Sequence, residues 1–95
     1  MSDEQINTLA ETLLPKIKVR LGEPEFNDDE LTEYIVDTIN ELISLGVKDE
    51  VISSSSSLGA ITKGVKDQWD YTDGAFSDDF YNRVDRLRRK VISNG

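Results

Sequence analysis

Basic side chains are concentrated near the end of the chain, where five of the eight residues from 83 to 90 are Arg or Lys. A dense group of cations is the usual chemistry of a surface that meets phosphates or carboxylates. The whole chain nevertheless has a formal charge of -8. The question is therefore which acidic partner this basic strip meets; its members are Arg83, Arg86, Arg88, Arg89 and Lys90.

Residues suited to catalysis are scarce. The chain has no Cys and no His, so the common zinc ligands and the usual general base near neutral pH are missing. The paired acids Asp28-Asp29 and Asp78-Asp79 each fall in the first turn of a predicted helix, where acids are expected for electrostatic reasons. We predict no enzymatic activity, no catalytic residues and no cofactor.

The stretch DYTDGAFSDD has the composition of a calcium-binding loop but not the spacing. With Gly74 at the invariant sixth position, Trp69 occupies the first ligand position and Phe80 the twelfth, where Asp and Glu are required. The sequence therefore predicts no metal site.

The elements that position these residues belong to one domain, residues 1–95, because a chain of this length builds a single thin core. No segment alternates with period two, so the fold class is all-α, a small bundle of four to five helices. The chain shows neither an export signal nor an apolar run long enough to span a membrane. We expect a soluble protein without membrane contact.

The first helical region is interrupted by a proline. Ser2 followed by Gln5 is a capping-box signal, and apolar residues then recur at spacings of three and four. Pro15 cannot donate a hydrogen bond to the carbonyl of Glu11. We predict a short helix ending near Thr12 and a second one starting near Pro15, with a single kinked helix as the alternative.

The clearest helix is FNDDELTEYIVDTINELISLGV, with Asn27 as its cap and Gly46 as its left-handed stop. Its apolar face includes Leu31, Ile35, Ile39 and Leu42.

The run of serines from Ser53 to Ser57 predicts a mobile loop, because serine competes for backbone hydrogen bonds within a helix. Leu58, Ile61, Val65 and Trp69 then keep helical spacing, although Gly59 and Gly64 each weaken that helix by about 1 kcal/mol.

Ser77 is predicted to cap the last helix, which presents Phe80, Val84, Leu87 and Val91 on one face. Aromatic residues cluster around the preceding turn. Acids alternate with them and would repel a phosphate backbone, so we expect a small aromatic core rather than a base-stacking surface. The aromatic residues are Trp69, Tyr71, Phe76, Phe80 and Tyr81.

Charge is distributed unevenly along the chain. Residues 1–50 contain thirteen acids and four bases, whereas residues 51–95 contain six acids and seven bases. One molecule therefore presents an acidic end and a complementary basic helix.

The segments LLPKIKVRLG, FNDDELTEYIVDTINELISLGV, ITKGVKDQWD and FYNRVDRLRRKV, in this order, resemble the small head-to-tail connector proteins of tailed bacteriophages. These are also called head-completion or adaptor proteins. The resemblance covers roughly residues 13–91 and brings no catalytic residues with it.

The resemblance implies a structural protein that forms a homo-oligomeric ring beneath the portal protein. Such a ring extends the DNA channel, lets DNA pass without sequence-specific binding and supports a downstream neck or tail-completion protein. The protein would be made in the bacterial host cytoplasm and reside in the virion neck. The basic strip would then be the subunit interface, because a ring joins two different faces of each copy.

Two other hypotheses remain open. The first is a small helical DNA-binding or regulatory module that uses the basic last helix, although a pI near 4.4 is unlike such modules. The second is an acidic inhibitor that mimics DNA, which the basic strip disfavours.

Overall fold

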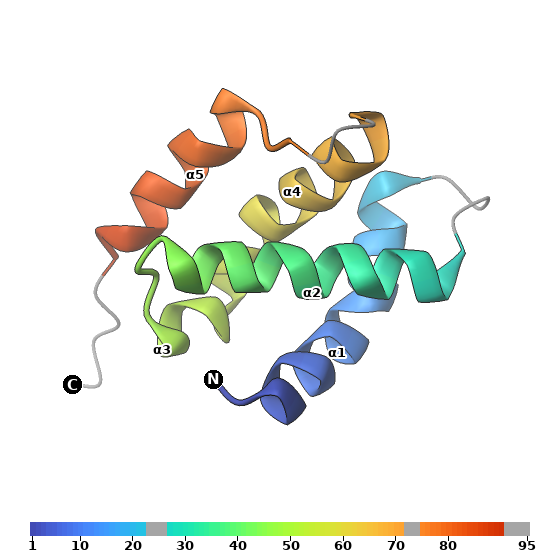
Figure 1. Ribbon diagram of the computed structural model, residues 1–95, viewed down its shortest axis with the longest axis horizontal. Coiled ribbons are helices and arrows are strands. Elements are labelled where there is room, and N and C mark those ends of the chain that lie inside the picture. The colour runs from blue at the N-terminus through green and yellow to red at the C-terminus, as the bar shows by residue number, and fades with distance from the viewer. Residues whose placement is uncertain (23–26, 72–74, 91–95) are drawn as a thin grey trace.

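The computed structural model describes residues 1–22, 27–71 and 75–90. These residues form five α-helices and one short 3-10 helix without any strand, which confirms the all-α prediction (Figure 1). Phe26 and Val91, which belong to segments predicted to be helical, and Gly74 of the stretch DYTDGAFSDD lie outside the described residues. The elements are α1 (Asp3–Leu21), α2 (Asp28–Ser44), α3 (Asp49–Ile52), η1 (Ser55–Ser57), α4 (Leu58–Asp70) and α5 (Asp78–Arg88).

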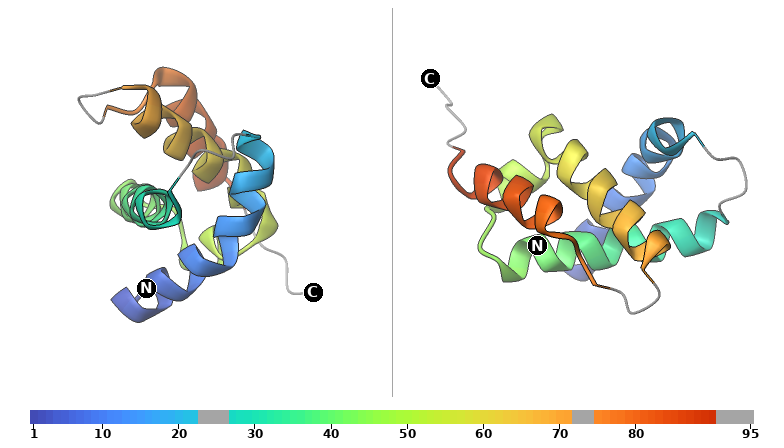
Figure 2. Two further views of the ribbon diagram at one scale, coloured as in Figure 1. Left: turned by 90° about the vertical axis from the view of Figure 1, so that its right-hand side faces the viewer. Right: turned by 90° about the horizontal axis from the view of Figure 1, so that it is seen from above.

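Helix α1 is continuous through Pro15, so the predicted break near Thr12 is wrong. Its axis changes direction partway along, as Figure 2 shows. Pro15 has no N–H to donate to the carbonyl of Glu11, and both residues are exposed. The inner face of α1 stays buried on both sides of the proline, at Ile6, Ala10, Leu13 and Ile17. Packing of this face holds the two halves in one helix.

Helix α2 begins and ends as the sequence predicts. The Asn27 side chain accepts hydrogen bonds from the backbone N–H groups of Asp29 and Glu30. At the other end Gly46 adopts a φ of 87°, and the N–H of Val47 donates to the carbonyl of Leu42. This left-handed stop turns the chain directly into α3.

The serine tract contains a short helix where we expected a loop. Its last three residues form η1, and two of its hydroxyls donate to carbonyls at the end of α3. Ser54 Oγ donates to the carbonyl of Val51 at 2.7 Å, and the buried Ser57 Oγ donates to that of Ile52 at 2.6 Å. The tendency of serine to bond nearby backbone, which opposes a long helix, here joins α3 to α4.

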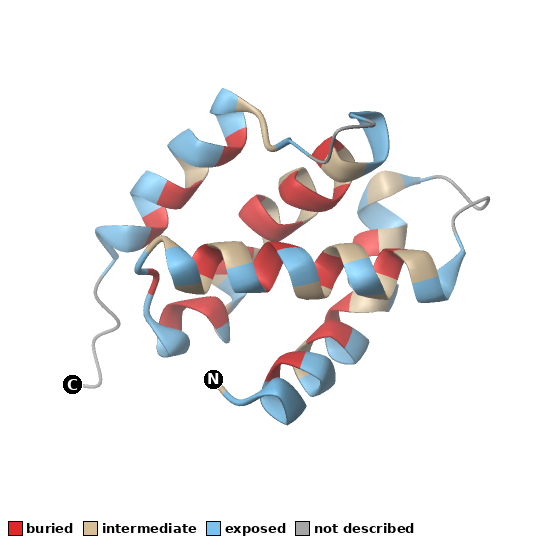
Figure 3. Ribbon diagram, in the orientation of Figure 1, coloured by how far each residue is buried: buried red, intermediate tan, exposed pale blue. Residues whose placement is uncertain are grey.

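The core lies between α2 and the helices on either side of it. Helix α2 packs against α1 and α4, and α5 packs against α4. Figure 3 shows the buried residues on the sides that these helices turn toward one another. Gly64 of α4 lies in close contact with α2, since a Cβ there would lie 2.5 Å from Cγ2 of Thr38. Among the described residues, no helix combines the length and apolarity that a bilayer crossing needs.

Candidate interaction surface

The basic strip occupies the second half of α5 and the turn that follows it. Ser77 caps α5 by accepting from the N–H of Phe80 at 3.2 Å, and Asp78 and Asp79 occupy the positive end of the helix dipole. Phe80, Val84 and Leu87 are buried, so α5 is held on the bundle by one apolar face.

The strip does not form one surface. Arg83, Arg86 and Lys90 turn toward α4 and η1, where they line a hollow of about 260 Å³ with Ser56, Ala60 and Leu87. Lys90 Nζ donates to Ser56 Oγ at 3.4 Å. Arg88 and Arg89 line a different hollow with Gly46 and Asp85, and Arg88 pairs with Asp85 at 3.4 Å. The five predicted interface residues therefore divide into two groups.

A second basic hollow adjoins the first through Arg83. It measures about 430 Å³ and lies between the end of α1, the outer side of α4 and α5. Its cations are Arg20, Lys63, Lys66 and Arg83, and no carboxylate is among its lining residues in the described parts of the chain. The two adjoining hollows gather six of the eleven bases of the chain into what we term the basic face: Arg20, Lys63, Lys66, Arg83, Arg86 and Lys90.

Several members of the basic face already have acidic neighbours. Lys66 Nζ lies 3.3 Å from Oδ1 of Asp70, and Arg83 Nε lies 3.3 Å from Oδ2 of Asp79. The hydrogen bond to Asp67 raises the pKa of Lys63 although burial lowers it, so Lys63 keeps its charge. Among the described residues, Arg20 and Arg86 form no hydrogen bond or ion pair, and these two guanidinium groups remain available to an outside anion.

Helix α2 bears the opposite charge. Its acids are Asp28, Asp29, Glu30, Glu33, Asp37 and Glu41, and it contains no Lys or Arg. Asp29, Glu33 and Asp37 are exposed at spacings of four, on the side of α2 away from its buried residues; we term these three the acidic face. A hydrogen bond to Glu30, then burial and the nearby acids, raises the pKa of Tyr34, as expected in a negative environment.

The acidic and basic faces lie on opposite sides of the molecule. Gly64 and Val65 of α4 are buried on its inner side, whereas Thr62, Lys63 and Lys66 line the hollow on its outer side. Helices α2 and α4 pack together through their inner sides. The left view of Figure 2 shows α2 nearly end-on, with the last turns of α1 and the first turns of α4 on one side of it. The acidic face therefore points away from the hollow on the other side of α4.

Among the described residues, Phe76, Phe80 and Tyr81 form an aromatic cluster. Phe76 stacks on Phe80 with ring centroids 4.4 Å apart, and Tyr81 meets Phe80 edge-on at 5.4 Å. Burial, together with the charge and hydrogen bond of Glu41, raises the pKa of Tyr81. The interaction of Tyr81 with Glu41 links α5 to α2. Trp69 and Tyr71 are 37% and 48% exposed and belong to the surface.

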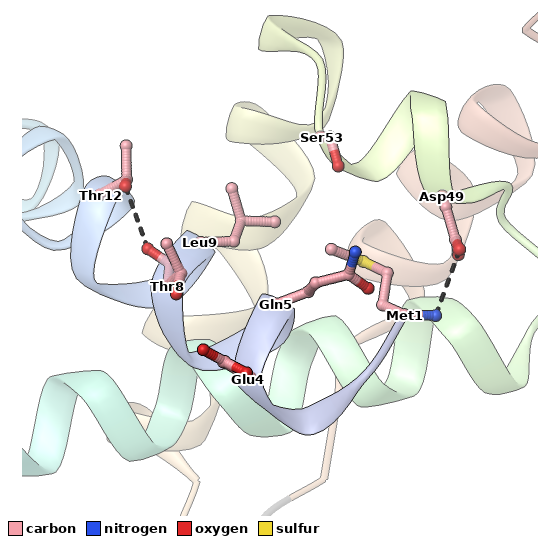
Figure 4. A pocket seen from close by; sticks show the side chains of 8 residues that line it. All are labelled: Met1, Glu4, Gln5, Thr8, Leu9, Thr12, Asp49 and Ser53. Atoms are coloured by element: carbon pink, nitrogen blue, oxygen red, sulfur yellow. Dashed lines mark hydrogen bonds and ion pairs between the residues drawn. The ribbon is translucent and has the colours of Figure 1, made fainter.

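Another hollow, of about 440 Å³, lies between α1 and α3 (Figure 4). Its charged side chains are Glu4 and Asp49, and the amino group of Met1 pairs with Asp49 at 3.2 Å. Its other polar groups are the hydroxyls of Thr8, Thr12 and Ser53 and the amide of Gln5, and none of these is a general base or an activated nucleophile. Among the described residues, no group of three or more Asp and Glu is placed to hold a metal ion.

Sequence patterns did not identify Arg20, Lys63 and Lys66 as members of a site. Lys63 and Lys66 are three residues apart and share a helix face, which is a usable local signal. No local pattern, however, places the end of α1 beside that face. Comparisons with protein-family models, curated proteins and solved structures each find no match to this chain.

Proposed function

We propose that the protein is a structural head-to-tail connector of a tailed bacteriophage, which forms a ring beneath the portal and extends the DNA channel. The observation that supports this proposal best is the placement of opposite charges on opposite sides of one small domain. A ring requires a heterologous interface, in which one face of each copy fits a different face of the next. A molecule with this asymmetry satisfies that requirement.

The net charge of -8 is consistent with a channel wall. A surface of the same sign as the phosphate backbone lets DNA slide without adhering. In this proposal the partners are further copies of the chain, the portal protein and a neck or tail-completion protein. The protein acts in the virion neck after synthesis in the host cytoplasm, and its role requires surfaces rather than catalysis.

The second candidate is a small DNA-binding or regulatory module. The basic face favours it, because six cations around two adjoining hollows offer contacts to phosphates. The pI of about 4.4 opposes it, since nucleic-acid-binding domains of this size usually have a strongly basic surface.

Negative-stain microscopy of the purified protein, alone and mixed with a candidate portal protein, tests the connector proposal. We expect rings, either free or seated on the portal. Particles that remain single copies in both samples would contradict the proposal. A gel-shift titration with duplex DNA at physiological salt tests the second candidate, for which binding at micromolar protein with a steep salt dependence is the supporting result.

A further inference from the structure

We infer that the acidic face of one copy docks on the basic face of a second copy, with Glu33 and Asp37 against Arg20 and Arg86. This inference deepens the proposed connector function and rests on its requirement for head-to-tail association. It also changes the interface expected from the basic strip. Arg20 of α1 enters the contact, whereas Arg88 and Arg89, which line a separate hollow, leave it.

The basic side of the contact has unused binding capacity. Arg20 and Arg86 line the two adjoining hollows, and neither has a hydrogen bond or ion pair among the described residues. Arg83 lines both hollows and is already paired with Asp79. Two free guanidinium groups in adjoining hollows favour a partner that presents two carboxylates, because each guanidinium accommodates a carboxylate in two-point contact.

The acidic side supplies such a pair. Glu33 and Asp37 are four residues apart on α2, so their Cβ atoms lie about 6 Å from each other on one helix face. Neither carboxylate has a hydrogen bond or ion pair within the described chain. With Asn7, Thr32 and the half-buried Val36 they line a hollow of about 320 Å³. The acidic face therefore offers two free charges beside a partly apolar surface.

A second copy fits both faces better than nucleic acid does. A phosphate backbone could also meet Arg20 and Arg86. It would leave Glu33 and Asp37 without cations. Because the two faces lie on opposite sides, one molecule cannot pair them internally, whereas a head-to-tail contact pairs the acidic face of one copy with the basic face of the next.

The strength of the contact follows from its composition. Exposed ion pairs are weak and are screened by salt within about 8 Å at physiological ionic strength. The apolar groups at the two faces are few, chiefly Val36 on one side and Leu87 with Ala60 on the other. Association of the isolated protein should therefore strengthen at low salt and weaken at high salt.

The experiment is sedimentation velocity on the full chain at low and high salt, with circular dichroism to check folding. The basic-face variant is Arg20→Glu with Arg86→Glu, and the acidic-face variant is Glu33→Lys with Asp37→Lys. All four side chains are exposed. A matched control, Lys48→Glu with Arg89→Glu, makes the same charge change as the basic-face variant at exposed positions outside that face.

We expect wild type and the control to associate at low salt, and each face variant to associate at least about tenfold more weakly, because attraction becomes repulsion. An equimolar mixture of the two face variants should associate again, since each supplies the charge that the other has reversed. The acidic-face variant tests the contact even if the basic-face variant unfolds. Wild type that stays a single copy at low salt, or a mixture that does not recover, overturns the inference.

The connector proposal and this inference fail in different ways. Rings of the basic-face variant on the portal would overturn the inference and leave the connector function in place. If the mixture of face variants associates again but wild type forms no ring on any portal, the connector function is overturned and the contact is kept. Duplex DNA shifted by wild type but not by the basic-face variant would assign the face to nucleic acid and overturn the inference.

Discussion

Asp67 on α4 accepts two hydrogen bonds from Ser77 through Oδ2, one from the backbone N–H at 2.9 Å and one from the hydroxyl at 2.7 Å. The hydroxyl oxygen of Ser77 in turn caps α5. On the other side, Lys63 Nζ lies 2.9 Å from Oδ1 of Asp67. Burial raises the pKa of Asp67, but the bonds from Ser77 and Lys63 outweigh it, and the pKa lies below 3.8. One buried carboxylate thus sets the start of α5 on α4.

Asp67→Asn should lower the free energy of unfolding by about 1–3 kcal/mol at pH 7, because the amide cannot replace a charged acceptor shared by Ser77 and Lys63. Urea denaturation measures the loss. Asp70→Asn is the matched control, since Asp70 is exposed and forms a surface ion pair with Lys66. The control should change stability by less than about 0.5 kcal/mol. Equal losses in the two variants would show that the buried carboxylate has no special role.

The same carboxylate predicts how stability depends on pH. Its pKa is lower in the folded chain than the ordinary value of 3.8, so its contribution is fully present above that pH. The contribution disappears as the pH falls through the folded-state pKa, where protonation breaks the contacts to Ser77 and Lys63. Subtracting the stability of Asp67→Asn from that of wild type across pH 2–6, a window of about four units around the reference value, isolates this effect. A difference that stays constant across the window would contradict it.

Two glycines of α4 should respond oppositely to alanine. At Gly64 a Cβ would lie 2.5 Å from Cγ2 of Thr38 and 2.8 Å from Cε1 of Phe80, so Gly64→Ala should cost about 1–3 kcal/mol of overpacking, more than its gain in helix propensity. At Gly59 the nearest atom is the flexible Nη1 of Arg83 at 3.4 Å. Gly59→Ala should raise stability by about 0.5–1 kcal/mol. Thermal melting of both variants measures the opposite changes in stability. If Gly64→Ala is stabilised as Gly59→Ala is, Gly64 is not in close contact with Thr38 and Phe80.

Leu42→Ala tests the packing of α2. Leu42 is fully buried in the core, so its truncation should lower the free energy of unfolding by about 2–5 kcal/mol. Val19, which is 81% exposed on α1, provides the control, and Val19→Ala should leave stability within about 0.5 kcal/mol of wild type. A melting temperature of Leu42→Ala close to wild type would show that α2 does not pack as described.

Reversal of Arg83, Arg86 and Lys90 to Glu separates assembly from folding. The three side chains line one hollow and lie outside the apolar core, so circular dichroism should remain close to that of wild type. Assembly should be lost, because three new carboxylates would face an acidic neighbour. Particle counts from negative-stain grids measure this loss. Rings of normal abundance would show that these three residues do not form the subunit contact. The connector proposal would then still be tested by portal binding.

Local patterns predicted the helices whose signals are local. Asn27, Gly46 and Ser77 begin or end helices through contacts within a few residues, and all three do so as expected. The effect of Pro15 was misjudged because the packing that holds α1 together comes from α2 and α4, outside the helix itself. The serine tract was misjudged for a different reason. The hydroxyls do bond to the backbone, but their acceptors are the carbonyls at the end of α3.

The residues of the basic face could likewise be predicted only in part from the sequence. Arg83, Arg86 and Lys90 follow from helical spacing on one element. Arg20 comes from a helix about sixty residues earlier in the chain, and only the packing of α1 beside α4 brings it to the hollow. The periodicity of a single helix gives no information on which cation of another helix will be its neighbour.

The missing side chain at Gly64 also sets a dimension of any larger structure. Helix α2 presents the acidic face and α4 presents much of the basic hollow, and the two helices are in close contact where Gly64 meets Thr38. The spacing at this contact contributes to the thickness of the molecule between the two faces. In a row of copies joined through these faces, that thickness is part of the repeat distance. A larger side chain at Gly64 would change the repeat distance by the same amount in every copy. A closed ring would then change its diameter or fail to close.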